Sequence, residues 1–84
     1  MGEIFSKKFE KQLAKLPQKI VLHFYDRLEV FLHNKFDPIL DNHSVDPIYP
    51  DCRSINVTGD YRAIFYEMGD TVVFMAIGTH AQLY

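Results

Sequence analysis

The chain has 84 residues, of which 48% are hydrophobic and 24% are charged, and its formal net charge at pH 7 is −2. This length predicts one domain, without room for a separate regulatory module. The acidic total argues against a protein that binds nucleic acid through non-specific charge alone. A single cysteine, Cys52, has no partner for an internal disulfide, which favours a reducing cytoplasm. No apolar run approaches membrane-spanning length, so no membrane partner is expected.

The charges are unevenly distributed along the chain. Residues 1–36 contain seven Lys or Arg against four Asp or Glu, whereas residues 37–84 contain two against seven. The first segment is therefore basic and the second acidic. The lysine face of the first predicted helix is of a kind that is most often simply solvated, but it is the one patch suited to contact ribosomal RNA.

The spacing of apolar residues predicts two helices after a candidate N-terminal strand at Glu3–Ser6. Ser6 is a suitable N-cap for the first helix, and Pro17 ends that helix and suits the first turn of the second. Apolar residues recur every three or four positions in both helices: Phe9, Leu13 and Leu16 in the first, and Ile20, Phe24, Leu28 and Phe31 in the second. Such helices must bury these faces against another layer.

A proline-rich loop follows the second helix and is long enough to be a functional segment. Three strands are then predicted at Arg53–Val57, Tyr61–Tyr66 and Thr71–Ile77, because these runs are rich in β-branched and aromatic residues and are separated by glycine-containing turns. We therefore predict an α+β fold, in which an N-terminal helical hairpin packs on a small antiparallel sheet. The sheet consists of the three-stranded C-terminal meander and the candidate N-terminal strand.

Three motifs lie in the loop and the predicted strands: Leu40-x-x-His43-x-Val45, Ile55-x-Val57-x-Gly59-Asp60-Tyr61-Arg62-x-Ile64-Phe65 and Ile77-Gly78-Thr79-His80-x-x-Leu83-Tyr84. Together with the order of the elements, they resemble the RelE/ParE toxin superfamily of type II toxin–antitoxin systems, and within it the RelE/YafQ-like mRNA interferases. The resemblance implies a single RelE-like toxin domain over residues 1–84. It also implies a cytoplasmic endoribonuclease that cleaves mRNA on the ribosome to inhibit translation, without cofactor or metal, and that is held inactive by a cognate antitoxin.

The resemblance also assigns the site. His43 matches the loop histidine of the YafQ-like pattern, and Arg62 matches the arginine that faces the scissile phosphate in RelE-like members. His80 and Tyr84 match the C-terminal histidine and the aromatic residue four positions on. We predict these four residues to be catalytic. A further set is predicted to contact substrate: Arg53, Tyr61, Lys7 and Lys8.

These residue types suit RNA cleavage without a metal. The reaction needs a base for the 2′-hydroxyl, stabilisation of charge on the phosphate, and an acid for the leaving 5′-oxygen. Histidine serves either proton-transfer role, since its unperturbed pKa of about 6.5 leaves both forms populated near neutrality. Which histidine is acid and which is base stays open. Arg62 offers a planar, charged fork for phosphate oxygens, and Tyr84 is a stacking or hydrogen-bonding group for the substrate.

Other interpretations of these residues stay open. Arg62 has a purely structural alternative, namely an ion pair with Asp60, Glu67 or Asp70 across the hairpin. The middle-strand histidine of YafQ-like enzymes is replaced here by Phe65. Two alternative functions follow from the scaffold: a ParE-like poison that binds DNA gyrase without catalysis, and an attenuated toxin that acts mainly through its antitoxin complex.

Overall fold

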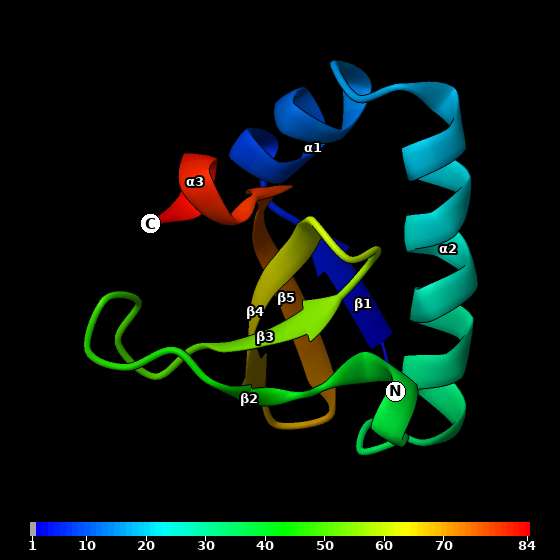
Figure 1. Ribbon diagram of the computed structural model, residues 1–84. Coiled ribbons are helices and arrows are strands. Elements are labelled where there is room, and N and C mark those ends of the chain that lie inside the picture. The colour runs from blue at the N-terminus through cyan, green and yellow to red at the C-terminus, as the bar shows by residue number, and fades with distance from the viewer. Residues whose placement is uncertain (1) are drawn as a thin grey trace.

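The computed structural model describes residues 2–84, and in this range five strands form one mixed sheet in the order β1-β5-β4-β3-β2 (Figure 1). The elements in chain order are β1 (Gly2–Phe5), α1 (Lys7–Ala14), α2 (Gln18–His33), the 3-10 turn η1 (Pro38–Leu40), β2 (His43–Ser44), β3 (Arg53–Asn56), β4 (Tyr61–Met68), β5 (Thr71–Thr79) and α3 (His80–Leu83). The predicted α+β class, with a helical hairpin before an antiparallel meander, is confirmed.

The strand count differs from the prediction in one detail, because the loop contributes the additional strand β2. Its two residues, His43 and Ser44, pair with Ser54 and Arg53 of β3. Two residues are too few to produce the alternating pattern by which strands are predicted. The candidate N-terminal strand is present as β1, which pairs with β5 in parallel.

Both helices pack on one face of the sheet and bury an aromatic core. The N-cap prediction for α1 is confirmed, since the Ser6 hydroxyl accepts a hydrogen bond from the Phe9 backbone N–H at 3.0 Å. Ser6 also donates to the Met75 carbonyl at 3.2 Å, which joins the start of α1 to β5. The rings that fill this core are Phe5, Phe9, Phe24, Phe31, Phe65 and Phe74.

The opposite face of the sheet carries a smaller core under the loop before β3 and the C-terminal helix. Its buried members are Val45, Cys52, Ile64, Ala76 and Leu83. A register shift between Ile64 and Phe65 accommodates one additional residue of β5 at this point. Because successive side chains of a strand point to opposite faces, Arg62 lies on this second face while Ala63 lies in the aromatic core.

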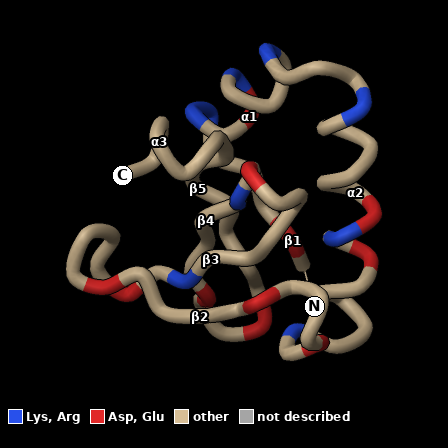
Figure 2. Tube along the Cα trace, viewed as in Figure 1, with Lys and Arg blue, Asp and Glu red and all other residues tan. Residues whose placement is uncertain are grey.

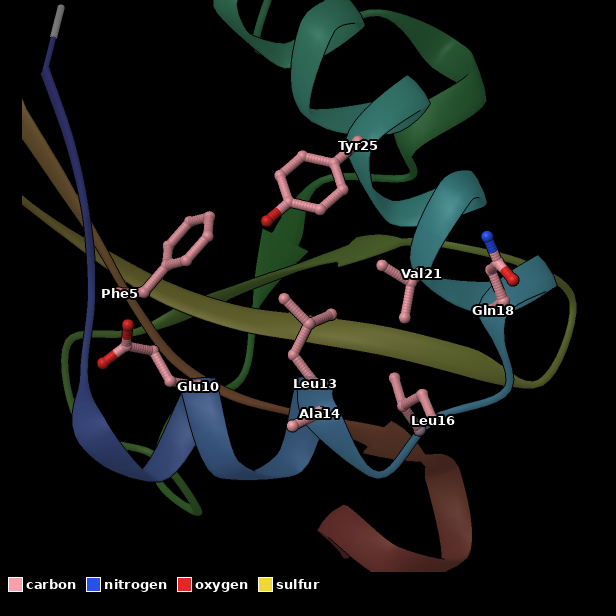
Figure 3. A pocket seen from close by; sticks show the side chains of 8 residues that line it. All are labelled: Phe5, Glu10, Leu13, Ala14, Leu16, Gln18, Val21 and Tyr25. Atoms are coloured by element: carbon pink, nitrogen blue, oxygen red, sulfur yellow. The ribbon is translucent and has the colours of Figure 1, made fainter.

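The two helices of the hairpin diverge from one another rather than packing along their length (Figure 1). A groove of about 430 Å³ opens between them, and the rings of Phe5 and Tyr25 lie at one end of it (Figure 3). Leu13 and Val21 form its apolar walls. No helix within residues 2–84 is long and apolar enough to cross a membrane.

The charge asymmetry of the sequence is also a separation in space (Figure 2). Lysines lie along α1 and at the start of α2, whereas acidic residues lie in the loops around β2 and in the turn between β4 and β5. The basic helix α1 is therefore distant from β2, the strand that carries His43 (Figure 2).

Candidate functional site

A hollow of about 410 Å³ opens on the face of the sheet away from α1 and α2. It joins residues of β2, the following loop, β4 and the C-terminal helix: His43, Val45, Asp46, Ile48, Arg62, His80 and Tyr84. Segments nearly forty residues apart in the sequence thus contribute to one concave surface. Such a hollow, with convergent polar groups, is the usual setting of a binding or catalytic site.

Arg62 is the most firmly held side chain of the hollow, and it is only 13% exposed. Its Nε donates to the Ser54 hydroxyl at 2.6 Å, and its Nη1 donates to the Asn56 side-chain oxygen. The register of the β3–β4 hairpin explains these contacts, because Asn56 lies directly opposite Arg62. The guanidinium is thereby fixed in one plane at the floor of the hollow.

The other end of the guanidinium contacts the segment before β2. Nη2 of Arg62 donates to the Asp41 carbonyl at 3.2 Å and lies 3.6 Å from the Asp41 carboxylate. Asp41 adopts a left-handed backbone conformation, with φ of 46°, at the end of η1. An anion therefore already faces Arg62 in the free protein, and a phosphate group would compete with it.

His43 lies beside Arg62 in an exposed position. Its Nδ1 is 2.8 Å from the Asp41 carbonyl oxygen and 3.2 Å from Arg62 Nη2. If Nδ1 carries the proton, it donates to Asp41 and leaves Nε2 as a base. If both ring nitrogens carry protons, Nδ1 still donates to the Asp41 carbonyl and the Nε2 N–H serves as an acid. The geometry therefore suits either proton-transfer role.

The Gly-Thr-His motif places His80 through a capping box. The Thr79 hydroxyl accepts from the Gln82 N–H at 3.2 Å, and the Gln82 side chain accepts from the Thr79 N–H at 2.9 Å. A Cβ at Gly78 would lie 2.8 Å from Gln82 Oε1, so glycine leaves room for this cap. The short helix then aligns the rings of His80 and Tyr84, whose centroids are 4.6 Å apart.

Tyr49 links the loop after β2 to this C-terminal helix. Its hydroxyl donates to the Leu83 carbonyl at 2.7 Å, and its ring meets that of Tyr84 edge-on at 5.9 Å. Burial, and to a lesser extent the neighbouring Tyr84 and Cys52, raises the pKa of Tyr49 above its ordinary value. Tyr49 is therefore a neutral hydrogen-bond donor that holds one side of the hollow against the other.

The four residues predicted to be catalytic, His43, Arg62, His80 and Tyr84, all line this hollow. Those predicted to contact substrate lie elsewhere. Arg53 projects from the other face of the sheet, where its Nε donates to the Asn42 side chain at 2.7 Å. Tyr61 packs against the aromatic core, and Lys7 and Lys8 are exposed on α1.

The alternative prediction for Arg62, an ion pair with Asp60, Glu67 or Asp70, is wrong. The acidic side chain beside Arg62 is that of Asp41. Glu67 pairs instead with Lys35, at 2.9 Å. Phe65 is fully buried in the aromatic core, so a histidine at that position would not reach the hollow. The residue that faces Arg62 from the neighbouring strand is Asn56.

Several residues of the hollow and its surroundings escaped sequence reasoning: Asp41, Asp46, Ile48, Tyr49, Ser54 and Asn56. Ser54 and Asn56 could have been predicted, since a hairpin closed at Thr58-Gly59-Asp60 brings β3 residues opposite Arg62. The sequence contains no pattern that identifies the loop residues. Within residues 2–84, no three His, Cys, Asp or Glu side chains cluster closely enough to hold a metal ion.

Comparisons with known proteins identify the family. Residues 4–84 match the family model described as "ParE toxin of type II toxin-antitoxin system, parDE". Among curated proteins, no sequence is similar enough to count as a match.

Solved structures share the fold at low sequence identity. YafQ from E. coli strain BL21(DE3) superimposes with a TM-score of 0.81 at 21% identity, covering 98% of this chain and 96% of that chain. A chain of the RelB-RelE antitoxin-toxin complex from Methanococcus jannaschii gives 0.76 at 23% identity, covering 96% and 94%. The YoeB/ParE toxin from Agrobacterium tumefaciens gives 0.78 at 10% identity, covering 95% and 99%. The chain therefore belongs to the ParE toxin family of type II toxin–antitoxin systems, within the RelE/ParE superfamily that its motifs resemble.

Proposed function

We propose that this toxin is a metal-independent endoribonuclease that cleaves mRNA on the ribosome and so inhibits translation. The observation that carries the proposal is the hollow that joins the Arg62 guanidinium to two histidines, His43 and His80. A protein that only binds a partner has no need of two proton-transfer groups beside an arginine. The fold shared with YafQ and RelE supports the same proposal.

The reaction uses the 2′-hydroxyl of the RNA as its nucleophile. One histidine takes the 2′-hydroxyl proton as the 2′-oxygen attacks phosphorus, and the other gives a proton to the departing 5′-oxygen. The bond from phosphorus to the 2′-oxygen forms while the bond to the 5′-oxygen breaks. The products are a 2′,3′-cyclic phosphate and a free 5′-hydroxyl.

Arg62 stabilises the charge that builds on the phosphate oxygens in the transition state. Its bonds to Ser54 and Asn56 orient the guanidinium before the substrate arrives. The Asp41 carboxylate is 63% exposed, so an incoming phosphate displaces it at little cost. Tyr84 positions the substrate by stacking on a base or by donating a hydrogen bond.

We infer that a cognate antitoxin protein is the regulatory partner and that the toxin acts in the cytoplasm. Proteins of this fold are bound in toxin–antitoxin complexes in the DinJ-YafQ structure from E. coli and the RelB-RelE structure from Methanococcus jannaschii. Here the hollow is open to solvent, with Tyr84 40% exposed and His43 exposed. An added strand or helix of a second protein would cover it. Arg53, Tyr61, Lys7 and Lys8 remain predicted substrate contacts away from the hollow.

A translating extract tests the proposed activity. Purified toxin is added, and message integrity is followed by primer extension with wild type and with His80→Ala. We expect new message ends with the wild type and intact messages with His80→Ala. Intact messages with both proteins would refute the nuclease.

A second candidate function is inhibition of DNA gyrase without catalysis, which the ParE name of the matching family favours. The two candidates differ in a simple assay. A gyrase poison inhibits DNA supercoiling and keeps that activity when His80 is replaced by alanine. A nuclease leaves supercoiling unaffected.

A further inference from the structure

The loop after β2 presents two exposed side chains to the hollow, and the proposed cleavage reaction does not use them. Ile48 is 63% exposed, and Asp46 is exposed beside it on the same loop. Both line the hollow with Val45 and Tyr84, so these residues supply apolar walls and one carboxylate. The same hollow carries Arg62 and the two histidines, and the His80 ring lies next to that of Tyr84, with centroids 4.6 Å apart.

The two kinds of lining residue, cationic and apolar, match the two halves of a nucleotide. A phosphate needs a cationic partner, and Arg62 offers one. A nucleobase has flat apolar faces, which pack on aromatic or aliphatic side chains, and a polar edge with hydrogen-bonding groups. Ile48 and Tyr84 supply surfaces for the faces of a base.

The Asp46 carboxylate suits the edge of a base and not a phosphate, because like charges repel. Its Oδ1 accepts a hydrogen bond from the Asp51 backbone N–H at 3.1 Å, which orients the group and leaves Oδ2 free. Each carboxylate oxygen accepts more than one hydrogen bond. Guanine presents two adjacent N–H donors on its Watson–Crick edge, whereas the single imino N–H of uracil lies between two carbonyl oxygens that a carboxylate repels. A carboxylate in the position of Asp46 therefore favours guanine over uracil.

Hydrogen bonds hold the loop after β2 in one conformation, so its side chains are fixed in place to recognise a base. The Val45 N–H donates to the Cys52 carbonyl and the Tyr49 N–H donates to the Val45 carbonyl, both at 3.1 Å. The Tyr49 hydroxyl ties the loop to Leu83 beside Tyr84. A side chain on such a loop meets a base at a defined distance and angle.

We propose that Val45, Asp46, Ile48 and Tyr84 form a subsite for one unstacked nucleobase next to the scissile phosphate, and that Asp46 favours guanine over uracil there. The subsite rests on the proposed cleavage of RNA. It adds the base preference of the same site.

Binding of uncleavable oligonucleotides tests the subsite apart from cleavage. The probes are the 2′-deoxy trinucleotides dU-dG-dU and dU-dU-dU, which lack the attacking hydroxyl. Binding is followed by NMR at the Ile48 methyl and Tyr84 ring signals. We expect at least about fivefold tighter binding of the guanine trimer to wild type, and a ratio near one with Asp46→Asn.

Asp51→Asn is the matched control, because Asp51 lies on the same loop outside the hollow. It should retain the guanine preference. Equal binding of both trimers to wild type, or shifts that avoid Ile48 and Tyr84, would overturn the subsite even if messages are cleaved. Guanine preference that depends on Asp46, combined with intact messages in the translating extract, would support the subsite and refute the nuclease.

Discussion

Replacing Arg62 by alanine separates the chemical role of this residue from its structural one. The guanidinium offers charged hydrogen-bond donors to the substrate phosphate. It also donates hydrogen bonds to Ser54, Asn56 and Asp41, which stabilise the fold. Both roles are lost in Arg62→Ala. Cleavage and stability must therefore be measured on the same protein.

The structure sets the size of each effect. A hydrogen bond from a charged group to the transition-state phosphate contributes roughly 1.5–3 kcal/mol, which corresponds to a loss of about 10- to 150-fold in cleavage rate. Ser54 is fully buried and loses its donor, so the free energy of unfolding should fall by about 1–3 kcal/mol. In Arg62→Ala combined with Ser54→Ala the stability loss should be smaller, because no orphaned hydroxyl remains, while the loss of cleavage stays.

Single-turnover cleavage of a ribosome-bound message measures the first effect, and urea unfolding measures the second. Arg27→Ala, on α2 at the opposite face of the sheet, is the matched arginine control and should cleave at the wild-type rate. A folded Arg62→Ala that cleaves as fast as wild type would refute the role of Arg62 in catalysis. It would leave Arg62 as a purely structural residue of the β3–β4 hairpin.

Two further predictions concern the segments that place His80 and Tyr84. Tyr49→Phe removes the hydrogen bond to Leu83 and should lower the free energy of unfolding by about 1 kcal/mol at neutral pH in urea titrations. Because the folded state raises the Tyr49 pKa above its ordinary value of 10.0, this group favours folding below that pH, and its contribution is lost as the pH rises further. The stability of Tyr49→Phe should therefore decline less steeply above pH 10 than that of wild type, and identical slopes would contradict this. Gly78→Ala should displace Gln82 and lower thermal stability by an amount equivalent to about 1 kcal/mol, with reduced cleavage; an unchanged melting temperature and rate would show that the capping box is dispensable.

The elements of the fold follow from local patterns, and the sequence predicts them well for that reason. Ser6 and Pro17 mark helix boundaries because their effects on the backbone are local. The meander follows from β-branched runs between turns. Strand alternation alone also separates Tyr61 from Arg62, because neighbours in a strand face opposite sides of the sheet.

The walls of the hollow depend on contacts between distant segments, and this explains why they were not predicted. Tyr49 reaches Leu83 across 34 positions of the sequence, and Asp41 reaches Arg62 across 21. The loop that carries Asp46 and Ile48 has no regular spacing of apolar residues. Its conformation therefore depends on hydrogen bonds to segments that are distant in the sequence. Arg62 and His80 were predicted because they lie in the motifs that resemble RelE/YafQ-like toxins, and His80 also directly follows a predicted strand.

The most direct test of the central claim is the chemistry of the RNA ends produced in a translating extract. We predict that wild-type toxin leaves 2′,3′-cyclic phosphate and 5′-hydroxyl ends, as attack by the 2′-hydroxyl requires. We also predict that His80→Ala leaves the messages intact. Intact messages with wild type, or the same cleavage with His80→Ala, would contradict the assignment of the hollow as a ribonuclease centre.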